Sequence, residues 1–361
     1  MSSMWITYFI IFIITALLSV VFTWFIRKIA LKLNIVDFPL NKRKIHEKAV
    51  PLLGGIAIFL SFFIVLYFVR DKLLEGNLEA HHWLGFFIGA LILVIGGFLD
   101  DKYNLKPKYQ IIFPILAAIS VIVGGVEIGK ITNPLGGFLL LDKWQIPIME
   151  WGGIIHSFVV ISDLIIIFWL MGMMYTTKLL DGVDGLVTGV TAIGGIIIFL
   201  FTITSKYYQP DIGIAALILS ACCLGFLIFN WHPAKIFLGE GGSLLLGYIL
   251  GVLAIISGGK IAILLLIMGI PILDVIWTII RRSIKGKNPF KFADKLHLHH
   301  RLLDLKIGQR KTVLIYYFLA ASFGVSGIFL QSAGKLLALF VLFMVMLGLV
   351  VGFTVFQKSS D

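Results

Sequence analysis

Long stretches of apolar residues, separated by short polar segments, run along almost the whole chain. A helix needs about 20 predominantly apolar residues to cross the hydrocarbon core of a bilayer. About eleven stretches are long enough, or nearly so, and we expect each to form a membrane-spanning helix. They lie at about residues 5–26, 53–69, 84–99, 109–126, 157–175, 185–204, 211–229, 242–258, 261–280, 312–331 and 335–356.

The composition also predicts an integral membrane protein, with an all-α polytopic fold. Hydrophobic residues make up 59% of the chain and charged residues only 14%, whereas soluble domains have about 25% charged residues. The two cysteines, Cys222 and Cys223, are adjacent within an apolar run, so they predict no disulfide framework. No segment has the composition of a soluble domain, and we expect residues 1–361 to form one membrane domain.

The basic residues indicate how the chain lies in the membrane. A net charge of +11 could point to nucleic acid, but in membrane proteins basic residues collect in cytoplasmic loops. With the N-terminus outside, the inner loops carry 23 of the 30 Lys and Arg residues and the outer loops carry 7. We therefore expect no nucleic-acid partner, a cytoplasmic C-terminus, and a small hairpin or interfacial segment in the long outer loop at about 127–156. The predicted cytoplasmic loops lie at about 27–52, 100–108, 176–184, 230–241 and 281–311.

Two pairs of carboxylates lie where predicted spans meet these loops. In GGFLDDKYNLKPKYQ, Asp100 and Asp101 are adjacent, so they must be solvated, protonated or held by cations. In KLLDGVDGLVTG, Asp181 and Asp184 would share one face of a helix, and each precedes a glycine that allows a tight turn. Carboxylates at a membrane boundary are costly and indicate function, although each pair could instead mark the end of a helix.

Two further inner segments carry a glycine-rich turn and a cluster of histidines. In FNWHPAKIFLGEGGSLLLG, the turn that begins a helix could present backbone N–H groups to a phosphate. Glu240 in that turn could hold a divalent metal or act as an N-terminal helix carboxylate. The segment DKLHLHHRLLDLKIGQRK lacks the spacing of a zinc site, and it favours a loop over a phosphate or over anionic lipid heads. Its cluster consists of His297, His299, His300 and Arg301.

The four segments should converge on one membrane face, between spans that could admit a lipid tail. Such a site suits phosphoryl transfer from a charged soluble donor to an acceptor in the membrane, with a metal and basic groups offsetting the charge of a diphosphate. A transporter of a phosphorylated or nucleotide-linked solute is the alternative. Transporters, however, place ionisable groups near the membrane midplane, and these groups lie at one edge.

In combination, the motifs resemble those of the polyprenyl-phosphate N-acetylhexosamine-1-phosphate transferases, which include WecA-like, TagO-like and MraY-like enzymes. The resemblance runs from KRKIHEKAVPLLGG to HLHHRLLDLKIGQRK, and the HxHHR form is closer to the WecA-like branch. It implies transfer of a sugar 1-phosphate, by default GlcNAc 1-phosphate, from a UDP-sugar to undecaprenyl phosphate, with release of UMP. It further implies Mg²⁺ (or Mn²⁺) as cofactor, a bacterial cytoplasmic membrane, and the first membrane step of cell-envelope polysaccharide synthesis. A homodimer is left open.

The resemblance also implies roles for individual residues. The catalytic set is Asp100, Asp101, Asp181, Asp184, His297, His299 and His300. The substrate-binding set is Lys48, Lys108, Lys178, Gly182, Asn230 and Arg301. Within these sets, Asp100 is the candidate for orienting or deprotonating the lipid phosphate, and Glu240 and Asp181 are the candidate metal ligands.

Two positions depart from the family pattern. Where the family usually has a metal-binding Asp, this chain has Glu240, and the usual NxxNxxDG motif has Tyr175 and Lys178 in place of its asparagines. We infer that Lys178 and Glu240 changed together, with Lys178 as a fixed cation that shares Glu240 or partly replaces the ion. The equal alternative is that Lys178 points elsewhere and Mg²⁺ binds as usual. A weak or inactive relative that binds lipid phosphate or nucleotide is a further alternative function.

Overall fold

The structure is a computed structural model, and it describes residues 2–39, 49–133, 137–151, 154–204, 208–257, 261–284, 286, 297–305 and 307–360. Among the predicted site residues, Lys48 lies outside this part, as do portions of the predicted loops at 27–52 and 281–311. The described chain is mostly helical. Its helices are α1 (Ser2–Lys32), α2 (Gly54–Phe68), α3 (Arg70–Leu73), α4 (Ala80–Tyr103), α5 (Pro107–Gln110), α6 (Ile112–Val123), α7 (Val160–Leu180), α8 (Leu186–Thr202), α9 (Pro210–Asn230), α10 (Gly239–Ile256), α11 (Ile261–Ile267), α12 (Gly269–Ile284), α13 (Leu298–Asp304), α14 (Gln309–Phe329) and α15 (Ser332–Ser360).

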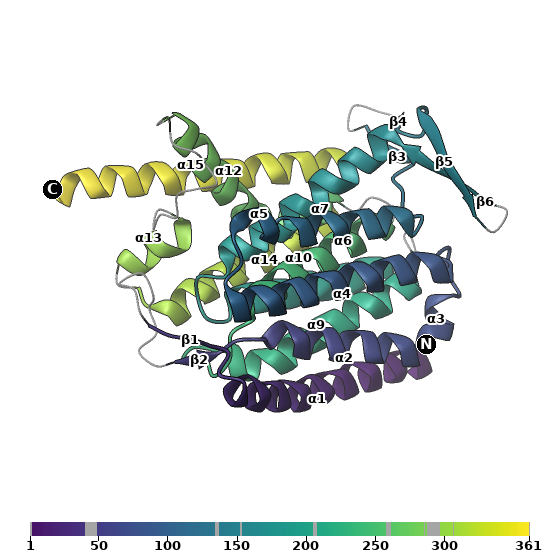
Figure 1. Cartoon of the computed structure of the whole chain (residues 1–361). Helices are drawn as coiled ribbons and strands as arrows, with labels where there is room; N and C mark the ends of the chain where they lie inside the picture. The colour runs from purple at the N-terminus through teal and green to yellow at the C-terminus, as the bar shows by residue number, and fades with distance from the viewer. Residues whose placement is uncertain are drawn as a thin grey trace.

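Within the described ranges, three antiparallel hairpins accompany the helices, so the expectation of an all-α fold needs correction. The strands are β1 (Val36–Asp37), β2 (Val50–Pro51), β3 (Lys130–Thr132), β4 (Phe138–Leu140), β5 (Gln145–Trp151) and β6 (Ile154–Val159), paired in that order. The hairpins β3–β4 and β5–β6 confirm the hairpin expected at about 127–156. Because β6 runs to Val159, the helix predicted from residue 157 begins only at Val160. These two hairpins lie at the opposite end of the molecule from β1–β2 (Figure 1).

Seven of the described helices are long and apolar enough to cross a membrane, so the chain is a multi-pass membrane protein. They are α1, α4, α7, α9, α10, α14 and α15. The pair α11 and α12 would form an eighth crossing, but it is bent by 79°. The span predicted over 261–280 is therefore broken rather than continuous, because Pro271 has no N–H to donate to Ile267 and the helix is interrupted between α11 and α12. Shorter apolar helices are α2, α8 and the pair α5–α6.

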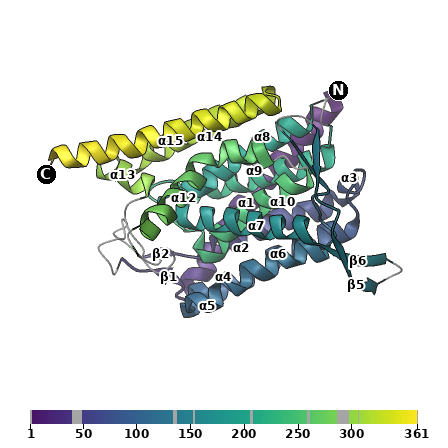
Figure 2. The same cartoon turned by 90° about the horizontal axis from the view of Figure 1, so that it is seen from above.

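Helix α10 lies in the middle of the bundle, and close glycine contacts fix its first turn to its neighbours. A Cβ at Gly97 of α4 would collide with the backbone of Gly241, and a Cβ at Gly55 of α2 would collide with the backbone of Gly242. Small residues let helix backbones approach this closely within membranes. The end of α4 and the starts of α2 and α10 are thereby held together at the end of the bundle where β1–β2 lies (Figures 1 and 2).

Candidate active site

A cavity of about 1300 Å³ opens at the end of the helix bundle where β1–β2 lies. Its walls come from β1–β2, from the C-terminal ends of α4, α7 and α9, and from the first turn of α10. Segments more than 100 residues apart in the chain, such as those around Asp101 and Glu240, therefore face one space. The predicted site residues that line it are Asp100, Asp101, Lys178, Asp181, Gly182, Asp184, Asn230, Glu240 and His300.

Carboxylates outnumber cationic side chains among the residues that line the cavity. Among the residues that the structure describes, six carboxylates face it, from Asp37, Asp100, Asp101, Asp181, Asp184 and Glu240, against the two lysines Lys178 and Lys235. An anionic ligand such as a diphosphate would be repelled by this surplus of negative charge unless a cation came with it. A phosphate-bearing ligand would therefore need an accompanying cation beside these described carboxylates.

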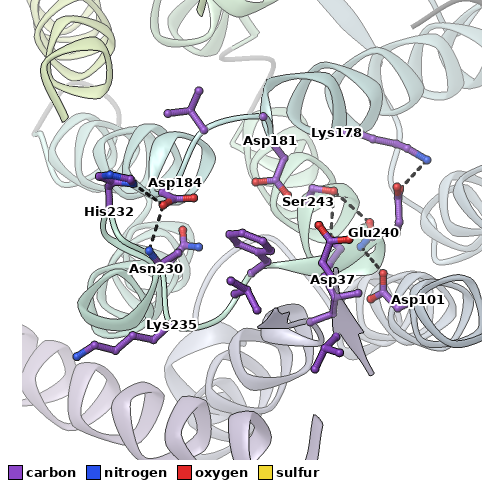
Figure 3. A pocket seen from close by; sticks show the side chains of 18 of the residues that line it. Asp37, Asp101, Lys178, Asp181, Asp184, Asn230, His232, Lys235, Glu240 and Ser243 are labelled. Atoms are coloured by element: carbon purple, nitrogen blue, oxygen red, sulfur yellow. Dashed lines mark hydrogen bonds and ion pairs between the residues drawn. The ribbon is translucent and has the colours of Figure 1, made fainter. Parts of the chain in front are cut away.

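On one side of the cavity, a chain of polar contacts joins α4, α5, α7 and α10. The Lys178 ammonium lies 2.7 Å from Glu240 Oε2 and donates to Gln110 Oε1 at 3.2 Å. Gln110 Nε2 donates to Asp100 Oδ1 at 3.1 Å, and the Glu240 backbone N–H donates to Asp101 Oδ1 at 3.0 Å. Figure 3 shows Lys178, Glu240 and Asp101 together on this side. The inferred pairing of Lys178 with Glu240 is therefore present, and Lys178 does not point elsewhere.

On the other side, Asp184 and Asn230 are held by the segment that follows α9. Asp184 Oδ2 lies 2.7 Å from His232 Nδ1 and accepts the N–H of Ala234 at 3.1 Å. Asn230 Oδ1 accepts the N–H of Gly185 at 3.1 Å, and its Nδ2 donates to a backbone carbonyl at 3.0 Å. Both side chains thus fix the start of α8 against the end of α9. A nucleotide contact through the Asn230 amide would have to compete with these bonds.

Asp181 lies between the two groups (Figure 3). Within the described part of the chain its carboxylate accepts no hydrogen bond, and it is open to solvent through the cavity. Nevertheless, the surrounding walls and the neighbouring carboxylates of Glu240, Asp184 and Asp101 raise the pKa of Asp181 to about 8. A raised pKa means that the ionised form is disfavoured, and a cation bound beside Asp181 would relieve that cost.

The histidine cluster is anchored by α12. Asp274 Oδ2 lies 2.9 Å from His297 Nδ1, and Asp274 Oδ1 accepts the N–H of Leu298 at 3.0 Å. His299 packs over Gly182, where a Cβ would lie 2.8 Å from its Nε2. Burial and the neighbouring imidazoles hold the pKa of His299 well below its usual range, which keeps the ring neutral. Of the cluster, His300 alone is among the residues that line the cavity.

The remaining predicted residues lie away from the cavity lining. His297, His299 and Arg301 are buried, and Lys108 is exposed with its ammonium over the Tyr109 ring. The glycine-rich turn also differs from the expectation, since its glycines pack against α2 and α4 and the Glu240 N–H is taken by Asp101. In this structure the turn is a packing element.

Several polar residues that the structure describes in or beside the site were absent from the predicted set, and three of them hold predicted residues in place: Gln110, His232 and Asp274. Gln110 and His232 lie within segments that the sequence did single out, but a contact with Lys178 or Asp184 leaves no local signal. Asp274 does have a local signal in the sequence, because it is a lone carboxylate inside the apolar run at 261–280. Such residues mark functional or anchoring positions.

The cavity fits a divalent metal that arrives with a substrate. Among the described residues, no group of three or more His, Cys, Asp or Glu side chains is arranged to hold a metal by itself. Mg²⁺ is usually held by one or two carboxylates together with substrate phosphates. Asp181 suits that mode because its carboxylate has no partner within the described part of the chain, whereas Glu240 is already paired with Lys178.

Fold and site together define a multi-pass membrane protein with a carboxylate-rich cavity at one end of its helix bundle. The chain belongs to glycosyl transferase family 4, the family of polyprenyl-phosphate N-acetylhexosamine-1-phosphate transferases, and residues 83–258 match the pattern of that family. It is 32% identical over 342 residues to a protein of Bacillus subtilis named "Probable undecaprenyl-phosphate N-acetylglucosaminyl 1-phosphate transferase", with 93% of this chain and 88% of the relative covered.

Two other relatives show how broadly this similarity extends. An undecaprenyl-phosphate alpha-N-acetylglucosaminyl 1-phosphate transferase of Thermotoga maritima is 29% identical over 314 residues, covering 87% of this chain and 88% of the relative. A phospho-N-acetylmuramoyl-pentapeptide-transferase of Bacillus licheniformis is 30% identical over 328 residues, covering 89% of this chain and 95% of the relative. The chain is thus almost equally identical to relatives whose names give different transferred groups.

Proposed function

We propose that the protein transfers GlcNAc 1-phosphate from UDP-GlcNAc to undecaprenyl phosphate, producing the lipid diphosphate sugar and UMP. The observation that carries this proposal is the convergence of two Asp pairs, Lys178 and Glu240 on one cavity at the end of a membrane helix bundle. The names of the relatives from Bacillus subtilis and Thermotoga maritima support the reaction and the lipid acceptor.

In this reaction an oxygen of the lipid phosphate attacks the phosphorus next to the sugar, and the bond from that phosphorus to the bridging oxygen of UMP breaks. The lipid phosphate is largely ionised near neutral pH, so positioning matters more than removal of a proton. The contacts of Asp100 agree with this view, because Gln110 and the N–H of Leu105 hold its Oδ1. Asp100 and Asp101 would then shape the corner of the cavity where α4 meets α10.

We propose Mg²⁺ as the cofactor, held by Asp181 together with the diphosphate. When bound, Mg²⁺ supplies positive charge to the diphosphate as the bond to UMP breaks. Lys178 adds a fixed ammonium on one wall of the cavity, and His300 adds an imidazole from the histidine cluster.

We further propose that all eleven apolar segments cross a bacterial cytoplasmic membrane, with the N-terminus outside and the cavity on the cytoplasmic side. The start of α1 and the end of α15 lie at opposite ends of the molecule (Figure 1), as an odd number of crossings requires. The excess of basic residues in the predicted inner loops supports the same orientation.

The test is UMP release by the purified protein in detergent, with undecaprenyl phosphate, a panel of UDP-sugars, and Mg²⁺ present or chelated. We expect release with UDP-GlcNAc that stops on chelation and returns on addition of Mg²⁺. Release with another UDP-sugar alone would correct the donor. Absence of release with every donor, from protein shown to be folded by its thermal unfolding, would overturn the proposed function.

Replacing Asp274 with alanine is expected to lower UMP release about tenfold, because it leaves buried partners of the histidine cluster without an acceptor. An unsatisfied buried polar group costs about 1–3 kcal/mol, so Tm should also fall. Asp304→Ala, at the exposed end of α13, is the matched control and should change neither quantity. Wild-type release by Asp274→Ala would show that the anchor is dispensable.

A further inference from the structure

We propose that Lys178 determines how the cavity acquires its cation: the Lys178 ammonium competes with a divalent metal for Glu240. A metal ion alone then binds weakly, and it binds well only as a complex with the nucleotide-sugar. The competition follows from contacts within the chain, and only the role of the nucleotide-sugar rests on the proposed function.

The first support is the way Lys178 is held. Its ammonium lies 2.7 Å from Glu240 Oε2 and 3.2 Å from the side-chain amide oxygen of Gln110, Oε1. Gln110 is in turn fixed, since its Nε2 donates both to Asp100 and to the carbonyl of Leu105, at 3.1 and 3.0 Å. The side chain of Lys178 is only 20% exposed. Because Lys178 is bound from two sides, its ammonium is a fixed charge in the cavity. A lysine side chain that moved freely in solvent would compete less well with a metal.

The second support is the way Glu240 is held. Its backbone N–H is bound to Asp101, and the next two residues, Gly241 and Gly242, are packed against α4 and α2. The backbone of Glu240 is therefore fixed on the wall, and its carboxylate stays within reach of Lys178. A metal that binds Glu240 through Oε2 must displace the ammonium of Lys178 from that oxygen. This competition is consistent with the lack of a three-residue metal group within the described parts of the chain.

The third support is the balance of charge when a diphosphate enters. Without a diphosphate, displacing the ammonium leaves Lys178 without a carboxylate partner at that wall. With a diphosphate, the metal can take Glu240 while the ammonium takes a phosphate oxygen, and lysine is a common point-charge partner of phosphate. Both cations then keep an anionic partner, so the exchange is favoured only when the nucleotide-sugar is present.

The cavity supplies its own control. Among the described residues that line the cavity, Lys235 is the second lysine, and it lies on the far side from Glu240 (Figure 3). Lys235→Gln removes the same unit charge from the same cavity without touching the ion pair. Comparison with Lys178→Gln therefore separates competition for Glu240 from a general change in electrostatic potential.

The experiment is a titration of Mn²⁺ alone, followed by electron paramagnetic resonance, on purified full-length protein in detergent. We expect Lys178→Gln to bind Mn²⁺ about tenfold more tightly than wild type, a coupling typical of charges in direct contact. Lys235→Gln should change the affinity less than about threefold, as should the charge-preserving Lys178→Arg. The gain from Lys178→Gln should vanish in the double variant Lys178→Gln/Glu240→Gln.

Three results would overturn the proposal: no gain in Lys178→Gln, an equal gain in Lys235→Gln, or a gain that persists without Glu240. If Lys178→Gln does not fold, the Mn²⁺ affinity of the Glu240→Gln variant tests the proposal instead. This variant should lose little Mn²⁺ affinity if Lys178 already occupies Glu240, as proposed. A loss of about tenfold or more would show that Glu240 is a free ligand and would overturn the proposal. Because Mn²⁺ binding needs no turnover, absence of UMP release would refute the transferase function and leave this result standing.

The role of the nucleotide-sugar is tested by repeating the titration with UDP-GlcNAc present. In wild type, UDP-GlcNAc should tighten Mn²⁺ binding about tenfold more than it does in Lys178→Gln, as expected for groups that share one network. Equal tightening in both proteins would show that the nucleotide-sugar does not help the metal to displace Lys178. It would overturn the part of the proposal in which the metal binds well only together with the nucleotide-sugar.

Discussion

Replacing Asp181 with asparagine is expected to reduce UMP release by about 100-fold or more. Asp181 lies between the two groups of polar residues in the cavity (Figure 3), and its carboxylate has no partner within the described part of the chain. Losing one element of transition-state charge stabilisation typically costs about 10²–10³ in rate, and Asp181 would contribute to it by holding the metal. An amide oxygen is a much weaker ligand for Mg²⁺ than a carboxylate, so more Mg²⁺ should be needed for half-maximal release.

The same substitution should leave folding intact, which distinguishes a loss of chemistry from a loss of structure. The surrounding cavity walls and the carboxylates of Glu240, Asp184 and Asp101 raise the pKa of Asp181 to about 8, so its charge does not stabilise the cavity. Tm of Asp181→Asn should therefore equal or exceed that of wild type. Asp71→Asn, whose side chain is 93% exposed on α3, is the matched control. Wild-type UMP release by Asp181→Asn would exclude Asp181 from the reaction.

The helices were predictable because the apolar runs are long and uninterrupted, and because a bilayer allows few alternatives to a helix. The bend between α11 and α12 was not predicted, since length and hydropathy alone treat 261–280 as one span. Pro271 carried the missing information, because its ring cannot continue the hydrogen bonding of the preceding helix.

The candidate site was predictable to the extent that polar side chains stand out in an apolar chain. Their partners were not, because the contacts join distant segments: Lys178 and Gln110 are 68 residues apart, and Asp184 and His232 are 48 apart. Only packing decides which segments meet. Packing likewise decided the glycine-rich turn, where sequence could not distinguish N–H groups that face a ligand from glycines that admit a neighbouring helix.

Replacing Gly97 with alanine is expected to damage the site from a distance, by pushing α4 away from α10. A Cβ at Gly97 would collide with the backbone of Gly241, which cannot move aside as a flexible side chain could. Overpacking of this kind costs about 1–3 kcal/mol, so Tm should fall. The same shift would break the contact between Asp101 and the Glu240 N–H, and displacements of about 1 Å can cost about 100-fold in rate.

Gly172→Ala is the matched control for Gly97→Ala. Gly172 lies within α7, and a Cβ there would meet no heavy atom within 4 Å. Alanine is favoured over glycine in a helix by about 1 kcal/mol, so Tm and UMP release should be unchanged or slightly raised. If Gly97→Ala behaved like Gly172→Ala in both measurements, the close approach of α4 and α10 would not be what positions Asp101 and Glu240. If only Gly97→Ala loses stability and activity together, the contact between these two helices is part of the active site, because it sets the distance between their carboxylates.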